Sequence, residues 1–218
     1  MGYGIRLDVE GPYALFTRPE FKAERVSYDV ITPSAARGIL EAILFKPAIR
    51  WIIDKIYVYN PITFTNIRRN EVSTKILAPS VKRAMLSGDR QLYLNTAKDR
   101  QLRASMILKD VHYCIEAHFE MTDKAGERDS EEKFYAMATR RMRNGETFHH
   151  PYFGCREFPV SFRLAEEDFV PPEQKGEKDF GWMLYDMDYS DMRSIKPVFF
   201  RAVMKDGVID LANAEIRR

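Results

Sequence analysis

The chain has 218 residues, of which 45% are hydrophobic and 30% charged, and its net charge is only +2. This length and apolar content support one large or two small globular domains and exclude an intrinsically disordered chain. Two cysteines exclude a disulfide framework, and no apolar run approaches the ~20 residues of a membrane span, so we expect a cytoplasmic protein with no membrane partner.

The first half of the chain alternates between strand and helix patterns. Residues 4–9 alternate apolar and charged side chains, which predicts a strand that ends at a Gly-Pro turn. A Thr-Pro pair opens residues 32–46, and apolar positions at helical spacing predict a helix there. Residues 50–64 are rich in β-branched and aromatic residues around an Asn-Pro break, which predicts two strands joined by a turn.

The second half of the prediction begins with a stretch whose apolar residues follow neither a helical nor a strand period. Residues 78–102 contain several turn-forming residues, and we expect them to form a long basic loop. Residues 111–121 alternate almost perfectly and predict a strand with one buried face. A helix is predicted at 130–144, and further strands at 158–164, 182–189, 198–204 and 208–211.

The order βαββαβ followed by extra strands predicts an α+β fold, with a ferredoxin-like (RRM-like) N-terminal domain and a C-terminal antiparallel β-sheet. We expect the ferredoxin-like domain, with its long basic loop, to span residues 1–165. The small antiparallel sheet domain is expected over residues 166–218.

Positive charge is concentrated in one segment. Residues 68–109 contain ten Lys or Arg but only three acids, whereas residues 111–218 contain 16 bases and 21 acids. A local surplus of this kind is typical of a surface that meets a polyanion, because each phosphate that Lys or Arg neutralises releases condensed counterions. A solvated basic loop has the same composition, so charge alone leaves both interpretations open.

Two groups of residues contain side chains that can transfer protons, bind a metal ion or bind phosphate. His112, Glu116 and His118 share one face of a predicted strand, but ~3.3 Å per residue puts the first two about 13 Å apart, too far to share a metal ion. His118 remains a candidate for proton transfer, and we expect no metal and no cofactor. The predicted helix at 130–144 places Lys133 near other cations, either as a phosphate clamp or as a complement to the helix dipole.

Six sequence blocks then occur in a distinctive order: residues 11–19 (Gly-Pro-Tyr-Ala-Leu-Phe-Thr-Arg-Pro), 24–28 (Glu-Arg-Val-Ser-Tyr), 33–39 (Pro-Ser-Ala-Ala-Arg-Gly-Ile), 46–47 (Lys-Pro), 153–157 (Phe-Gly-Cys-Arg-Glu) and 202–204 (Ala-Val-Met). Together they resemble the type I-C (d subfamily) Cas-five proteins of CRISPR systems, which belong to the RAMP superfamily. The resemblance extends over essentially the whole chain.

The resemblance implies an endoribonuclease that binds the repeat hairpin of precursor CRISPR RNA. It would cleave that RNA by attack of a ribose 2′-hydroxyl, without a required metal, and stay bound as a subunit of the type I-C surveillance complex. Its partners would be CRISPR repeat RNA and the other subunits of that complex.

The resemblance also identifies catalytic positions. The family has a tyrosine where this chain has Leu44, and a Lys-His pair where this chain has Lys133 and Phe134. The cation is therefore retained, and Tyr135 or His118 is expected to replace the missing proton carriers. We expect phosphate contacts from nine basic residues: Arg37, Lys46, Arg68, Arg69, Lys82, Arg83, Arg140, Arg141 and Arg156.

Two alternatives follow from the same residues. Leu44 and Phe134 also fit a non-catalytic subunit that binds guide RNA. The basic surface equally fits duplex DNA, since phosphate contacts carry no information about the type of nucleic acid.

Overall fold

The computed structural model describes residues 3–21, 23–165 and 169–217. In this part of the chain ten strands form one connected sheet in the order β10-β8-β9-β3-β5-β1-β6, with β2 and β4 paired to β5 and β7 paired to β8. All neighbours are antiparallel except β2 and β5. The strands are β1 (Gly4–Ala14), β2 (Arg25–Val26), β3 (Ile49–Val58), β4 (Thr63–Val72), β5 (Arg100–Met121), β6 (Ser161–Leu164), β7 (Glu177–Asp188), β8 (Lys196–Lys205), β9 (Val208–Asp210) and β10 (Ile216–Arg217).

The central strand of this sheet is β5, which is 22 residues long. Its C-terminal half lies between β1 and β3, and Ile115 is opposite Leu7 on one side and Ile56 on the other. All three side chains are fully buried. The predicted strand at 111–121 is confirmed, but it is only the second half of a strand that begins at Arg100.

Helices α1 (Pro33–Ile43) and α3 (Glu131–Asn144) cover one face of the central strands. The Thr32 hydroxyl accepts a hydrogen bond from the Ala35 backbone and caps α1, as the Thr-Pro pattern predicts. Ser130 caps α3 in the same way, and Gly145 ends it in a left-handed conformation. Among the described residues, no helix is both long and apolar enough to cross a membrane.

The C-terminal strands continue the central sheet. Strand β9 pairs with β8 on one side and with β3 on the other, so the β7–β8 hairpin is joined to the N-terminal strands by backbone hydrogen bonds. The predicted strands at 198–204 and 208–211 are confirmed within two residues, and the one predicted at 182–189 is confirmed but begins five residues earlier, at Glu177. The domain boundary expected between residues 165 and 166 adjoins residues 166–168, which lie outside the described residues.

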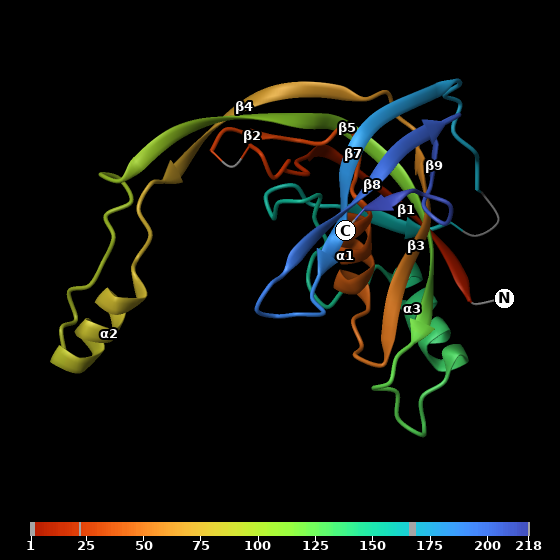
Figure 1. Cartoon of the computed structure of the whole chain (residues 1–218). Helices are drawn as coiled ribbons and strands as arrows, with labels where there is room; N and C mark the ends of the chain where they lie inside the picture. The colour runs from red at the N-terminus through yellow and green to blue at the C-terminus, as the bar shows by residue number, and fades with distance from the viewer. Residues whose placement is uncertain (1–2, 22, 166–168, 218) are drawn as a thin grey trace.

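Beyond the body, β4 and the first half of β5 continue as a long two-stranded ribbon with α2 (Ala78–Ser87) at its end (Figure 1). We call residues 63–109 the arm. The expectation of a loop throughout residues 78–102 is wrong for α2, which starts with Pro79 in its first turn and ends at Gly88 with φ of 70°. No residue of α2 is buried, so its apolar residues show no core-facing pattern in the sequence.

Arm and body meet at Asp110, where β5 changes partners. Asp110 has φ of 51°, a left-handed conformation that Asp tolerates better than most residues. The Asn60 side chain donates a hydrogen bond to the Asp110 carbonyl at 2.8 Å and fixes this bend.

A loop of residues 151–159 packs against the segment that follows β1 through Gly154. Its φ is +76°, and a Cβ there would lie 2.1 Å from the Leu15 carbonyl oxygen. We expect Gly154→Ala to lower the free energy of unfolding by about 2 kcal/mol, because a left-handed residue with a Cβ costs ~1–2 kcal/mol before the clash is added.

Thermal unfolding measures this loss, and Gly38→Ala is the matched control. A Cβ at Gly38 meets nothing within 4 Å, so this variant keeps or raises the stability. Equal losses in the two variants would contradict the packing described for Gly154.

Candidate nucleic-acid interface

The basic segment of the sequence forms the arm. Arg68 and Arg69 lie on β4, and Lys82 and Arg83 lie exposed on α2. The ten bases and three acids of residues 68–109 are therefore presented on a projecting ribbon and its tip rather than on the body (Figure 1). A projecting basic ribbon can follow a phosphate backbone over several nucleotides.

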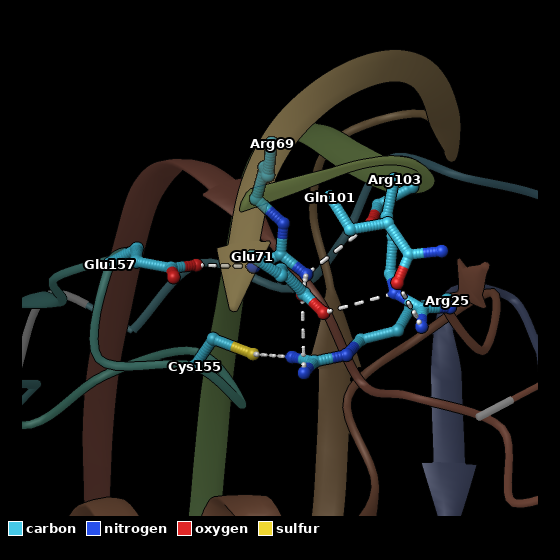
Figure 2. A network of polar contacts seen from close by, with 8 residues as sticks. Arg25, Arg69, Glu71, Gln101, Arg103, Cys155 and Glu157 are labelled. Atoms are coloured by element: carbon cyan, nitrogen blue, oxygen red, sulfur yellow. Dashed lines mark hydrogen bonds and ion pairs between the residues drawn. The ribbon is translucent and has the colours of Figure 1, made fainter. Parts of the chain in front are cut away.

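At the end of the ribbon that leads to α2, charged residues from three strands and one loop converge (Figure 2). Because segment 73–99 leaves the ribbon here, we call this group the root cluster. Its centre is the Glu71 carboxylate of β4. The members are Arg25 of β2, Arg69 and Glu71 of β4, Gln101, Arg103 and Ser105 of β5, and Cys155 and Glu157 of the loop at 151–159.

Glu71 binds three guanidinium groups. One of its oxygens lies 3.3 Å from Arg25 and 3.2 Å from Arg69, and the other lies 3.7 Å from Arg103. Arg69 and Arg103 are directly opposite each other across β4 and β5, where like charges destabilise a strand pair. The carboxylate offsets this repulsion.

Arg69 is the most buried cation of the cluster, with 13% of its side chain exposed. It also contacts Glu157 at 2.6 Å and donates a hydrogen bond to the Ser105 hydroxyl at 3.3 Å. Arg25 lies 3.9 Å from the Cys155 sulfur. Three guanidiniums thus face two carboxylates, and the cluster keeps a net positive charge while holding the arm against the loop.

The two adjacent arginines expected to bind phosphate have different roles. Successive residues of a strand point to opposite faces, so Arg68 projects away from the root cluster that contains Arg69. Arg68 is exposed on that opposite face.

A second group surrounds the N-terminus of α3. Lys133 forms an ion pair with Asp129 at 2.8 Å, which lowers the pKa of the Asp129 carboxyl. The more distant Lys46 acts on Asp129 in the same direction. Lys133 is about half exposed, so its ammonium group is accessible to a ligand that displaces the carboxylate.

Next to Lys133, Glu132 accepts a hydrogen bond from the Tyr3 hydroxyl at 3.1 Å. This bond raises the pKa of the Tyr3 phenol and helps to lower that of Glu132. The ring of Tyr135 lies against Tyr3 at a centroid distance of 4.9 Å. Two phenol groups and one carboxylate therefore meet at the start of α3, the helix that also carries the cation retained from the family pattern.

His118 is not part of this group. It lies on the sheet face opposite the buried Phe119 and Ala117, which pack toward α1 and α3, and its Nδ1 lies 2.9 Å from both oxygens of Asp54. The thickness of the sheet therefore separates His118 from Lys133. Among the described residues, no three His, Cys, Asp or Glu side chains are grouped as metal ligands.

The other predicted phosphate-binding residues differ in availability. Arg37 binds the Asp186 carboxylate of β7 through two nitrogens, at 2.7 and 2.9 Å. Arg141 donates to the Ile43 carbonyl at 2.7 Å and ties α3 to α1. Arg140 makes an exposed contact with Glu146, and Arg156 lies exposed on the loop at 151–159.

Sequence reasoning missed Arg25, Glu71, Arg103, Tyr3 and Glu132. A local signal exists for the arm residues, because positions two apart share one face of a strand: Arg69 with Glu71, and Gln101 with Arg103 and Ser105. No pattern predicted that Tyr3 and Glu132, 129 positions apart, would meet.

We expect Glu71→Gln to loosen the arm, because three partly buried guanidiniums lose their shared counter-charge, at a local cost of about 1–3 kcal/mol. Hydrogen exchange at the backbone amides of 67–72 and 100–105 should then be at least tenfold faster. Glu120→Gln is the control, since its partner Arg50 is 65% exposed and such pairs contribute at most ~1 kcal/mol. Unchanged exchange in Glu71→Gln would show that the cluster does not hold the arm.

Comparisons with known proteins agree with this architecture. A family model described as "CRISPR-associated protein (Cas_Cas5)" matches residues 4–212. A protein of Mannheimia succiniciproducens, named CRISPR pre-crRNA endoribonuclease Cas5d, is 51% identical over 97% of this chain and 96% of its own length. A protein of the same name from Thermus thermophilus is 39% identical over 85% of this chain and 73% of its own length.

Solved structures show the same fold at low sequence identity. The crystal structure of a CRISPR-associated protein has a TM-score of 0.69 and 23% identity, over 99% of this chain and 96% of that one. A chain of a CRISPR RNA-guided surveillance complex has a TM-score of 0.54 and 13% identity, over 98% and 89% of the two chains. With the match to residues 4–212, these likenesses show that the chain belongs to the Cas5d family of CRISPR-associated proteins.

Proposed function

We propose that this protein is a CRISPR endoribonuclease that binds the repeat hairpin of precursor CRISPR RNA, cleaves it and remains on the product as a subunit of the type I-C surveillance complex. The observation that carries this proposal is the 51% identity, over nearly all of both chains, to a protein named as a pre-crRNA endoribonuclease. The basic arm, the root cluster and Lys133 support it from the structure.

The proposed reaction needs no metal. The 2′-hydroxyl of one ribose attacks the adjacent phosphorus, the bond from phosphorus to the 5′-oxygen of the next nucleotide breaks, and a 2′,3′-cyclic phosphate forms. A base removes the proton of the 2′-hydroxyl, an acid protonates the 5′-oxygen, and a cation stabilises the charge on the phosphorane. Lys133 at the positive end of α3 is suited to the cation's role.

The side chains that meet at the start of α3 suggest which groups move protons. The hydrogen bond to Glu132 raises the pKa of the Tyr3 phenol, so this phenol can act as an acid, and the pKa of Glu132 is lowered, so it is an ionised carboxylate. The Tyr135 phenol belongs to the ring that lies against Tyr3. We therefore place proton transfer at Tyr135, with Tyr3 as its neighbour, and leave His118 out because it lies on the other sheet face.

Phosphate binding is proposed for the arm and the root cluster. The carboxylates of Glu71 and Glu157 occupy the positions that phosphate oxygens of RNA would take beside the guanidiniums of Arg25, Arg69 and Arg103. Arginine forks match phosphate and carboxylate geometry equally well, so RNA can compete for these donors. Exposed Arg68, Lys82, Arg83, Lys46, Arg140 and Arg156 would add contacts along the strand.

We further propose that residues 1–165 form a ferredoxin-like unit. The strand order β6-β1-β5-β3, with α1 and α3 on one face, supports this, because a βαββαβ chain gives that order in this fold. Residues 166–218 would then be a second unit whose strands extend the same sheet through β9.

A non-catalytic guide-RNA subunit is the second candidate, and one observation favours it. Leu44 and Phe134, at the family's tyrosine and histidine positions, are almost completely buried, so neither position contributes to a surface reaction. RNA binding without cleavage is the result that this candidate predicts.

The test is cleavage of the cognate repeat RNA in EDTA. We expect the wild-type protein to cleave it, and Lys133→Ala to cleave at least 100-fold more slowly, the usual effect of removing one group that stabilises transition-state charge. RNA affinity should change much less than the rate, because Lys133 is one of many cations near the RNA.

Two variants control for the ion pair. Asp129→Asn removes the carboxylate partner of Lys133 but keeps the ammonium group, and we expect it to retain cleavage. Lys124→Ala removes another exposed lysine nearby and should cleave like the wild type. If wild type and Lys133→Ala both bind the RNA and leave it intact, the non-catalytic candidate is correct.

A further inference from the structure

A cavity of about 230 Å³ lies between α1 and residues 149–154. It is smaller than the ~300–1,000 Å³ typical of sites for drug-sized ligands, so it suits a flat fragment rather than a whole nucleotide. None of its described lining residues is Asp, Glu, Lys or Arg.

Aromatic rings form one side of the cavity, and small residues form the other. The rings of His149 and Tyr152 lie nearly parallel, 28° apart, with centroids separated by 6.3 Å. On the opposite side, α1 contributes only the short side chains of Ser34 and Ala35 and the glycine at position 38. Little of the helix therefore projects into the cavity. A Cβ on Gly38 would meet nothing within 4 Å, so this part of the helix faces open space.

The cavity is already formed in the free protein. The backbone amides of Phe148 and His149 both donate to the Ala42 carbonyl, at 2.8 and 3.3 Å, which holds the segment against the end of α1. The Phe153 amide donates to the Phe158 carbonyl at 2.8 Å and closes the following loop. When a ligand binds such a preformed site, little free energy is lost to ordering the protein.

The position of the cavity points to its ligand. Gly154 lines it, and the next residues of the same loop, Cys155 and Glu157, contact Arg25 and Arg69 of the root cluster. A cluster of arginines suited to bind phosphates therefore lies next to an uncharged cavity that is lined by aromatic rings. Proteins that bind single-stranded nucleic acids combine these two features, since the backbone follows the cations while bases stack on aromatic rings.

We propose that this cavity holds one unpaired nucleobase of the bound RNA, next to phosphates at the root cluster. This proposal rests on the proposed function, because the RNA is its ligand. The base stacks on Tyr152 or His149, and the Ser34 hydroxyl, the Tyr152 phenol and the His149 imidazole are available for hydrogen bonds to its edge.

The test fills the cavity without disturbing the fold. Gly38→Leu places a side chain into the open space, and a leucine is favoured over glycine inside a helix, so thermal stability should be kept or raised. Repeat RNA that carries 2-aminopurine at each unpaired position in turn is the probe. With the wild type, one position should show a large fluorescence change, and Gly38→Leu should abolish it and weaken affinity about tenfold.

His149→Ala is the second variant, because it removes an exposed ring without adding volume, and it should reduce the same signal. Asn144→Leu, which adds an exposed leucine at the end of α3, should behave like the wild type. If wild type binds the RNA and neither cavity variant changes affinity or fluorescence, the nucleobase proposal is wrong. If wild type does not bind repeat RNA at all, the proposed function itself fails, so the two failures can be told apart.

Discussion

Strand β5 determines the arrangement of everything else in this molecule. Its 22 residues belong to two environments: the second half is held between β1 and β3 in the core, and the first half pairs with β4 and leaves the core beyond the buried Ile107 and Leu108. Because the same backbone runs through both, the arm cannot rotate freely against the body. The bend at Asp110, fixed by Asn60, sets the direction in which the ribbon leaves.

The root cluster also holds the arm in place, and it is the part of the arm that we propose binds phosphate. Buried strands need apolar side chains, but the end of the ribbon that leads to α2 carries partly buried arginines. Arginines on adjacent strands repel one another unless a carboxylate lies between them. Glu71 supplies that carboxylate, and Glu157 connects the cluster to the loop at 151–159. The free protein therefore has a set of guanidiniums fixed in place before any phosphate arrives, which lowers the entropic cost of binding an anion.

Much of this fold follows from periodicity. The helices α1 and α3 and the body strands have strong patterns, because each must bury one face against the same core. Helix α2 was missed, since a helix with no buried residue shows no such pattern. The site was harder to predict, because its contacts join distant positions: Tyr3 meets Glu132, and Arg25 meets Glu71. Family resemblance identified Lys133, whereas the strand pattern suggested His118, which the sheet separates from Lys133.

The central claim is that RNA lies along the arm, the root cluster and the start of α3. Hydrogen exchange of the full chain, with and without repeat RNA, measures this most directly. We predict slower exchange at residues 67–72, 100–105 and 151–159 and in the first turn of α3, with little change in β7 and β8. Protection confined to the β7–β8 hairpin, with the root cluster unaffected, would contradict this account.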